Sequence, residues 1–286
     1  VVQDAWEPYT DTLRVDRVGS VIGVKHGRGP EPRRRLLLAA HIDEIGLMVK
    51  QIVTHNGNGF LRLTKVGGVD IRHLYGQTVV VHGQRDLIGV IGSLPGRMLP
   101  EAKHNKPFGF EDLLVDVGMS ETQVNELVSV GDFITFRQPL RQLLGKNVTG
   151  KALDNRASVT AVTVCLDYLQ SRHHDWDVIA VATSQEETTF LGAYTSAYAQ
   201  QPDAAIAIDV TFAKGAGLNE SQAYTLGSGP ALDIGPNVHP GMLKSLHNTA
   251  QVLEMKVSQG AHSRASGTDA YALQVARAGI PTGLVS

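Results

Sequence analysis

Three short apolar segments of the chain share one design, in which a continuous hydrophobic run leads directly into polar side chains. They lie at residues 36–40, 178–182 and 204–208. A run that is continuous rather than alternating is typical of a strand buried on both faces, as in a parallel sheet packed between helices. The pattern therefore predicts neighbouring strands at the centre of an α/β domain.

Segments with helical periodicity separate these strands. Residues 157–170 follow Asp154 and Asn155, which are both favoured helix caps, and residues 190–200 and 269–277 predict two further helices. Strands that alternate with helices in this way favour an α/β fold with a central mixed sheet flanked by helices.

The stretch from about residue 49 to residue 141 has a different pattern of hydrophobic and turn residues. It combines short β-type runs with glycine turns such as the one at residues 56–59, and Ser120 with Gln123 forms a capping box that predicts a helix over residues 121–128. The β-type runs lie at residues 78–81, 87–91 and 133–136. Closely spaced strands with glycine turns indicate a small β-barrel or sandwich.

The alternating strand and helix pattern and the β-rich pattern divide the chain into two domains. We predict a discontinuous catalytic α/β domain formed by residues 1–48 and 142–286. Residues 49–141 are expected to form an inserted β-rich domain, a small β-barrel, that interrupts the α/β domain just after its first polar strand end.

The composition is that of an ordinary globular protein, with 42% hydrophobic and 19% charged residues among 286. Lys and Arg number 26 and Asp and Glu 28, so the charge balance gives no electrostatic footprint for nucleic acid. No run approaches the roughly 18 apolar residues that a membrane span needs, and no apolar leader opens the sequence. The single cysteine, Cys165, excludes an intrachain disulfide and a Cys-rich zinc site, and it fits a cytoplasmic protein.

Polar side chains that are able to bind metal follow each of the three apolar runs. His41 and Asp43 follow the first, Glu186 and Glu187 the second, and Asp209 the third. Sites in open α/β sheets form beyond the carboxyl ends of the strands, so we expect these groups to share one site. Imidazole nitrogen and carboxylate oxygen are zinc ligands, and a two-metal site also needs a bridging carboxylate.

Asp154 lies at a predicted helix entrance, where a bridging carboxylate would be held rigidly. His41 and Asp43 point the same way on an extended strand, so Asp43 is placed to accept the second ring N–H of His41. Adjacent Glu186 and Glu187 repel each other at the end of a buried strand unless a cation or a shared proton offsets their charge. One as metal ligand and the other as general base resolves this conflict. Taken singly, the same residues are also compatible with a buried histidine, a helix cap and a solvated helix start.

The sequence Ala-His-Ile-Asp-Glu-Ile-Gly at residues 40–46 resembles the first metal motif of the cytosolic two-zinc aminopeptidases. That family includes glutamyl aminopeptidase, deblocking aminopeptidase and the tetrahedral TET peptidases, and some relatives are also described as endoglucanases. Further motifs similar to those of the family follow in the same order, at residues 150–156, 185–187, 208–211, and 267–270 with 279–282. The inserted segment is similar as well, at residues 67–70, 89–92 and 130–132.

The resemblance covers nearly the whole chain and implies a centre of two divalent metal ions, zinc or alternatively cobalt. By position, it implies that Asp154 bridges the two ions. His41 and Asp209 would then bind one ion and Glu187 the other.

The resemblance also implies roles in a reaction. Glu186 would be the general base and Asp43 would support His41, in a metal-assisted hydrolysis that removes residues from the free N-termini of peptides. Assembly through the inserted domain into dimers and hollow dodecamers is implied too. Two rivals remain: another two-metal amide hydrolase of the deacylase or carboxypeptidase type, and a catalytically impaired relative that keeps the fold and the assembly.

The sequence departs from the family pattern at two places. Asn155 stands where the family usually has a second aspartate, next to the proposed bridge. The last ligand of the family is a histidine a few residues beyond residues 279–282, and the sequence stops at Ser286 before reaching it. Both ends look trimmed, and we expect the full protein to continue with that histidine within about ten residues, a strand's usual length.

Asp269 and the remaining histidines carry weaker signals. Asp269 falls in the first turn of a predicted helix, where an acidic residue is ordinary, so a helix start and a place in the substrate pocket both stay open. His173 and His174, beside Asp175, are expected on a surface turn. For His262, no spacing partner identifies a role.

Overall fold

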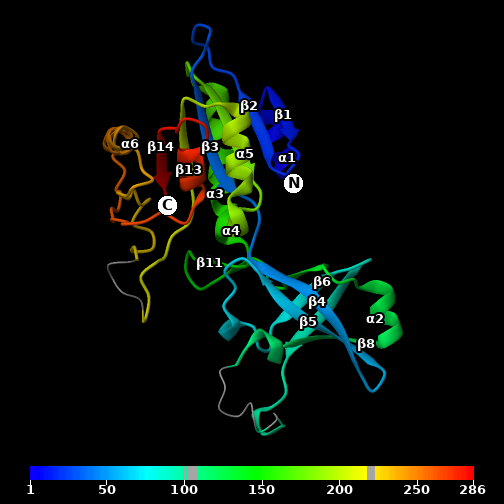
Figure 1. The fold of residues 1–286 in the computed structure, drawn as a ribbon. Helices are drawn as coiled ribbons and strands as arrows, with labels where there is room; N and C mark the ends of the chain where they lie inside the picture. Colours follow the sequence, from blue (N-terminus) through cyan, green and yellow to red (C-terminus); the bar gives the residue numbers. More distant parts are fainter. Residues whose placement is uncertain (99–100, 102–107, 218–222) are drawn as a thin grey trace. The chain divides into compact units, whose positions relative to one another are not determined.

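The computed structural model describes residues 1–98, 101, 108–217 and 223–286. The chain divides into two compact units, one formed by Val1–Asp43 with Leu153–Ser286 and the other by Glu44–Ala152 (Figure 1). The sequence pattern places the divisions after residues 48 and 141. The second unit is wider than that because strand β4 (Gly46–His55) belongs to it at one end and strand β11 (Val148–Thr149) at the other.

The first unit is built on a 6-stranded sheet with the strand order β1-β2-β12-β3-β13-β14. Strands β12, β3, β13 and β14 run parallel, whereas β2 is antiparallel to both β1 and β12. The strands are β1 (Thr12–Val15), β2 (Val21–Lys25), β3 (Arg35–His41), β12 (Asp177–Thr183), β13 (Ala204–Ile208) and β14 (Thr282–Val285). The three apolar runs are thus neighbouring parallel strands, and the predicted mixed sheet is confirmed.

Helices cover both faces of this sheet (Figure 1). In β3, Leu37 and Ala39 share a buried core with residues of α5 and α7, whereas Leu38 and Ala40 share another with residues of α1 and α3. Alternate residues of a strand point to opposite faces, so a continuous apolar run fills both cores. The helices are α1 (Val2–Trp6), α3 (Leu153–Ser171), α5 (Leu191–Gln200), α6 (Pro240–Val252) and α7 (Asp269–Val275).

Two helical details differ from the sequence prediction. The pattern predicts one helix over residues 190–200, but a short helix α4 (Glu186–Thr189) precedes α5, and Phe190 between them is left-handed with φ 55°. Helix α6 has no counterpart in the prediction. Poor helix formers such as Asn248 and Thr249 interrupt its apolar pattern, and packing against the unit stabilises it instead.

The second unit is a closed antiparallel barrel with the strand order β4-β5-β8-β7-β6-β9, which confirms the predicted β-barrel. The hairpin of β4 and β5 turns at Asn56 and Gly57, both with positive φ, as an Asn-Gly hairpin turn requires. Helix α2 (Glu121–Leu127) carries the predicted capping box at Ser120 and Gln123. The other barrel strands are β5 (Asn58–Val66), β6 (Thr78–His82), β7 (Asp86–Gly92), β8 (Leu114–Ser120) and β9 (Phe133–Phe136). Strand β10 (Arg141–Gln142) follows in the chain and pairs with β11 in a separate antiparallel sheet. Across the described ranges, no helix has the length and apolar character for a membrane crossing.

Candidate metal centre

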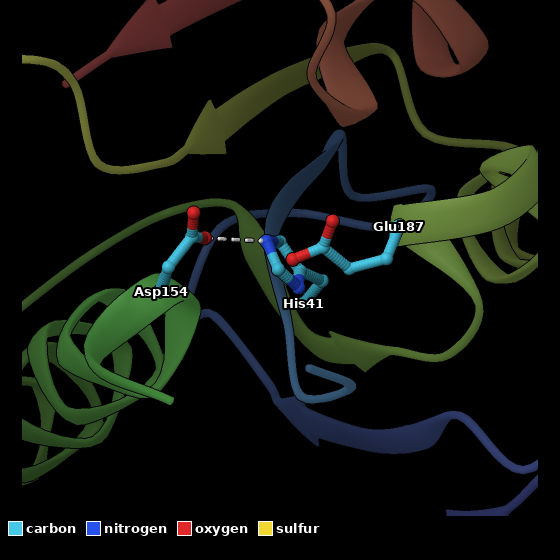
Figure 2. A group of neighbouring side chains, drawn as sticks. All are labelled: His41, Asp154 and Glu187. Atoms are coloured by element: carbon cyan, nitrogen blue, oxygen red, sulfur yellow. Dashed lines mark hydrogen bonds and ion pairs between the residues drawn. The ribbon is translucent and has the colours of Figure 1, made fainter. Parts of the chain in front are cut away.

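The carboxyl ends of the parallel strands bring the predicted site residues together at one edge of the sheet. His41 is the last residue of β3 and pairs in register with Thr183, the last residue of β12. The His41 side chain is 2% exposed, and its Nε2 atom lies 3.0 Å from Asp154 Oδ1 (Figure 2). Nε2 is also 3.7 Å from Glu186 Oε2 and 3.7 Å from Asp209 Oδ1. One buried imidazole is therefore surrounded by carboxylates from three other segments.

Asp154 stands at the entrance of α3, where the backbone is not yet helical, with φ −82° and ψ 105°. Its side chain is 59% exposed and is turned towards His41 (Figure 2). The next residue, Asn155, is buried, and its Nδ2 donates a hydrogen bond to the carbonyl oxygen of Ile208 at 2.9 Å. Because Ile208 ends β13, this bond fixes the helix entrance beside the strand end that carries Asp209.

Glu186 and Glu187 follow β12 and open helix α4. Gln185 turns the chain there with a left-handed φ of 59°. The carboxylate of Asp43 accepts the backbone N–H of Glu186 at 3.1 Å and that of Glu187 at 3.2 Å. The Glu187 side chain points towards His41 (Figure 2). Asp43 thus holds the backbone of both glutamates in place.

The ring of His41 is oriented by the same residue. Its Nδ1 lies 3.1 Å from the carbonyl oxygen of Asp43 and 3.6 Å from the Asp43 carboxylate. Both groups can only accept, so Nδ1 carries a proton and Nε2 is the ring atom directed at the other carboxylates. In a neutral ring, this leaves the lone pair of Nε2 for a metal ion.

Two groups of side chains in this cluster have the donor atoms and the spacing that a metal ion needs. One is His41 with Asp154 and Glu187, and the other is His41 with Glu186 and Asp209; within each group the ligand atoms lie within 4.8 Å of one another. Zinc bonded at about 2.1 Å holds tetrahedral ligands roughly 3.4 Å apart, so small side-chain movements separate this arrangement from coordination. The residues present therefore fit a divalent cation.

Comparison with known proteins decides the family. Residues 19–286 match the M42 glutamyl aminopeptidase family. The chain belongs to this family. Among its relatives, the lysyl aminopeptidase of Pyrococcus furiosus is 31% identical over 290 residues, covering 100% of this chain and 81% of the relative.

Solved structures of TET peptidases have the same fold. The TET aminopeptidase of a Thaumarchaeota archaeon from marine sediment gives a TM-score of 0.91 at 30% identity, covering 99% of this chain and 80% of that one. The TET1 peptidase of Pyrococcus horikoshii, which can assemble into a tetrahedron or a large octahedral shell, gives 0.82 at 31%, covering 100% and 83%. The resemblance read from the motifs is confirmed, and it places the chain in a family of metal-dependent aminopeptidases.

The carboxylates of this M42 centre lie close together and buried, so that a positive charge among them would stabilise their ionised forms. Burial raises the pKa of Glu186 to about 8, and neighbouring carboxylates add to the shift although His41 opposes it. Burial likewise raises the pKa of Asp209 to about 7 and raises that of Glu187. Carboxyl groups that resist ionisation when buried together become favourable anions beside a divalent cation.

The excess of negative charge also affects the pKa of His41. Burial lowers its pKa, but the hydrogen bonds to Asp154 and Asp43 and the charges of Asp209 and Glu186 outweigh burial and raise the pKa to about 11. A single imidazolium cannot neutralise all of these carboxylates. Bound cations would replace its proton and release Nε2 as a ligand.

A cavity of about 310 Å³ opens at the cluster. The predicted residues His41, Asp154, Glu186, Glu187 and Asp209 all line it, whereas Asp43 supports them from behind. Asp233 and His262 also line this cavity and form a hydrogen bond at 2.8 Å across 29 residues of sequence. The sequence analysis missed both, since the one available signal was the place of His262 just before the motif at residues 267–270.

Asp269 contacts Thr183 at the end of β12 and is not among the residues that line the cavity. It is buried, it begins α7 after the cap residue Thr268, and it accepts a short hydrogen bond from Thr183 Oγ1. Burial raises the pKa of Asp269 to about 6. Of the two readings left open by the sequence, the helix start is the one that this geometry favours.

Proposed function

We propose that the chain is a two-metal aminopeptidase that hydrolyses the first peptide bond of substrates with a free N-terminus. The observation that carries the proposal is the cluster of one buried imidazole, His41, with the carboxylates of Asp154, Glu187 and Asp209 around one cavity, and Glu186 beside them. Family membership supports the reaction, and the raised pKa values of the buried acids fit a site that takes up positive charge.

The ligand roles follow from position. Asp154 lies 3.0 Å from Nε2 of His41 and turns an exposed carboxylate into the cavity, which suits a bridge between two ions. Asp209 is the proposed partner of His41 on one ion, and Glu187 is the proposed ligand of the other. We propose zinc as the metal, with cobalt as the alternative, because imidazole and carboxylate suit either.

Glu186 is the proposed general base. Its carboxylate is buried, lines the cavity and lies close to His41 without being required as a ligand by the two-ion scheme. When bound, the two ions supply Lewis acidity to the scissile carbonyl and to the attacking water. Glu186 takes a proton from that water as its oxygen bonds to the carbonyl carbon. The same carboxyl group returns the proton to the leaving amine nitrogen as the C–N bond breaks.

Self-association belongs to the same proposal. The TET1 relative can form a tetrahedron or a large octahedral shell. We propose that this chain assembles likewise into dimers and dodecamers, with the barrel unit, Glu44–Ala152, providing contacts between copies. Light scattering of the purified protein measures the mass of the assembly directly, and a monomer at micromolar concentration would contradict this part.

A substrate panel tests the reaction. The zinc- or cobalt-loaded protein should cleave aminoacyl p-nitroanilides and shorten a peptide from its N-terminus, while leaving the N-acetylated forms intact. Cleavage of the acetylated forms, or shortening from the C-terminus, would identify a deacylase or a carboxypeptidase instead. Two bound metals with no hydrolysis of any of these would identify a catalytically impaired relative.

A further inference from the structure

Asp233 and His262 form a hydrogen-bonded pair in the wall of the cavity that holds the metal cluster. Nε2 of His262 lies 2.8 Å from Oδ2 of Asp233. Asp233 is 2% exposed, whereas the His262 side chain is 46% exposed. The pair therefore has a buried acceptor and an accessible ring.

Asp233 is held firmly by other donors. Its Oδ1 accepts the hydroxyl of Tyr224 at 2.6 Å and the backbone N–H of Gly260 at 2.7 Å. A side chain at Gly260 would place Cβ 2.2 Å from the Tyr224 hydroxyl, so only glycine allows this approach. Isolated parallel bridges, one of them between Ile234 and Ala261, tie the two segments together. The carboxylate of Asp233 is therefore held in one position, from which it can orient the ring of His262.

The orientation leaves one nitrogen of His262 available. A carboxylate only accepts, so Nε2 donates to Asp233, and in the protonated ring Nδ1 is a second donor. In the part of the chain that the structure describes, no hydrogen bond engages Nδ1 of His262. A group that enters the cavity can therefore take up this nitrogen as a hydrogen-bond partner.

The cavity offers few donors to a substrate. Its described lining contains carboxylates, hydroxyls and apolar groups but neither Lys nor Arg, and Nε2 of His41 is already directed at carboxylates. A volume of about 310 Å³ is at the small end for ligand sites of roughly 300–1,000 Å³, and His262 lines this volume together with the carboxylates. The free amine of a peptide suits carboxylate acceptors. Its carbonyl oxygen is an acceptor, and a donor in the cavity wall would act on it together with the Lewis acidity of the bound ions.

We propose that His262 donates a hydrogen bond from Nδ1 to the carbonyl oxygen of the scissile peptide bond, and that Asp233 is the positioning residue that fixes its ring. This role rests on the proposed peptidase function. As water adds to the carbonyl carbon, negative charge builds on that oxygen, and a fixed donor stabilises the charge more than it stabilises the neutral carbonyl. His262 then acts mainly on kcat, because the hydrogen bond strengthens after binding.

Steady-state kinetics of the zinc-loaded protein on the aminoacyl p-nitroanilide that it cleaves best tests the proposal. His262→Ala should lower kcat about a hundredfold, the typical loss of one such donor, with KM nearly unchanged and two zinc ions still bound. His262→Gln, which keeps an N–H at similar reach, should recover part of the rate. The matched control is His173→Ala, which removes another His–Asp pair, at 3.0 Å on the exposed surface, and should leave kcat unchanged.

Asp233→Asn separates positioning from a structural role. Alone, it should lower kcat about tenfold, and in the His262→Ala background it should add almost nothing, because both changes remove the same interaction. Equal losses in both backgrounds would overturn the positioning role of Asp233.

Three results decide the role of His262 itself. Metal-loaded His262→Ala with wild-type kcat, or with raised KM alone, would overturn it. If the alanine variant loses zinc or unfolds, His262→Phe, which keeps a ring but has no donor, carries the test. A wild-type kcat in that variant with a wild-type melting temperature would overturn the role as well. Wild-type protein that cleaves no aminoacyl anilide with either metal would instead refute the proposed function, and the role of His262 with it.

Discussion

Asp43→Asn perturbs the one side chain that contacts both the histidine and the glutamates of the centre. The wild-type carboxylate accepts two backbone N–H groups, from Glu186 and Glu187, and lies 3.6 Å from Nδ1 of His41. Asparagine keeps one acceptor oxygen and turns an NH₂ group towards another donor. One charge-assisted hydrogen bond is therefore lost, and the backbone N–H of either Glu186 or Glu187 then faces the NH₂ group of the asparagine, which cannot accept it.

The structure sets the expected size of the effect. Losing a hydrogen bond to a charged group costs about 1.5–3 kcal/mol of unfolding free energy. For a unit of this size, a loss of about 2 kcal/mol corresponds to a fall in Tm of roughly 4–8 °C. Because α4 and the ring of His41 lose a shared support, zinc affinity and kcat/KM should each fall about 10–100-fold.

Calorimetry of the apoprotein and zinc titration against a competing chelator measure the two effects separately. The control is Asp11→Asn, because Asp11 also accepts a backbone N–H, from His26, and a second donor, Lys25. Lys25 pairs with Val178 at the start of β12, so Asp11 lies at the sheet edge opposite the centre, and its variant should lose stability but keep zinc affinity. Asp43→Asn with lowered Tm but wild-type zinc affinity and activity would show that Asp43 is only a helix cap.

Four further outcomes are expected. Glu186→Gln should keep both metals and lose about a hundredfold or more in kcat, as loss of a general base predicts, and near-normal cleavage would exclude that role. Asp154→Ala should empty both metal positions whereas His41→Ala should weaken mainly one, as native mass spectrometry would show; two tightly held metals in the first variant would contradict the bridge. Asn155→Ala should lose about 1–3 kcal/mol in urea unfolding, because the part-buried hydrogen bond from Asn155 Nδ2 to the carbonyl of Ile208 is lost. Burial raises the pKa of Asp177, but hydrogen bonds from the Gly27 N–H and from Arg33 outweigh burial and lower the pKa. The contribution of Asp177 to the free energy of unfolding is therefore present above about pH 4 and is lost as the pH falls through the pKa of the folded state. The difference in urea stability between the wild type and Asp177→Asn should shrink below about pH 4, and a constant difference would contradict this assignment.

The strand ends were predictable because their signal is local. Each apolar run fills both faces of a buried strand, and each is followed within four residues by His41, Glu186 or Asp209, so the sequence indicates both the strand and the edge where it ends. Parallel strands then bring these residues together without further information. The barrel was equally local, through turns such as Asn56-Gly57.

The supporting contacts were not predictable, because they join distant segments through geometry alone. Asp43 fits the expectation of a partner for His41, but its capping of Glu186 and Glu187 depends on a left-handed turn at Gln185 that no sequence pattern announces. The contact of Asp233 with His262 spans 29 residues and rests on isolated bridges rather than a regular strand pair. Neither periodicity nor spacing carries such information.

Anomalous X-ray scattering at the zinc edge, from crystals grown with zinc, tests the two-metal account most directly. The account predicts two peaks roughly 3.5–4 Å apart, the usual separation of paired catalytic metals. One peak should contact His41 and Asp209, the other Glu187, and Asp154 should contact both. A single peak, or a peak bound by Glu186 in place of Glu187, would contradict the account.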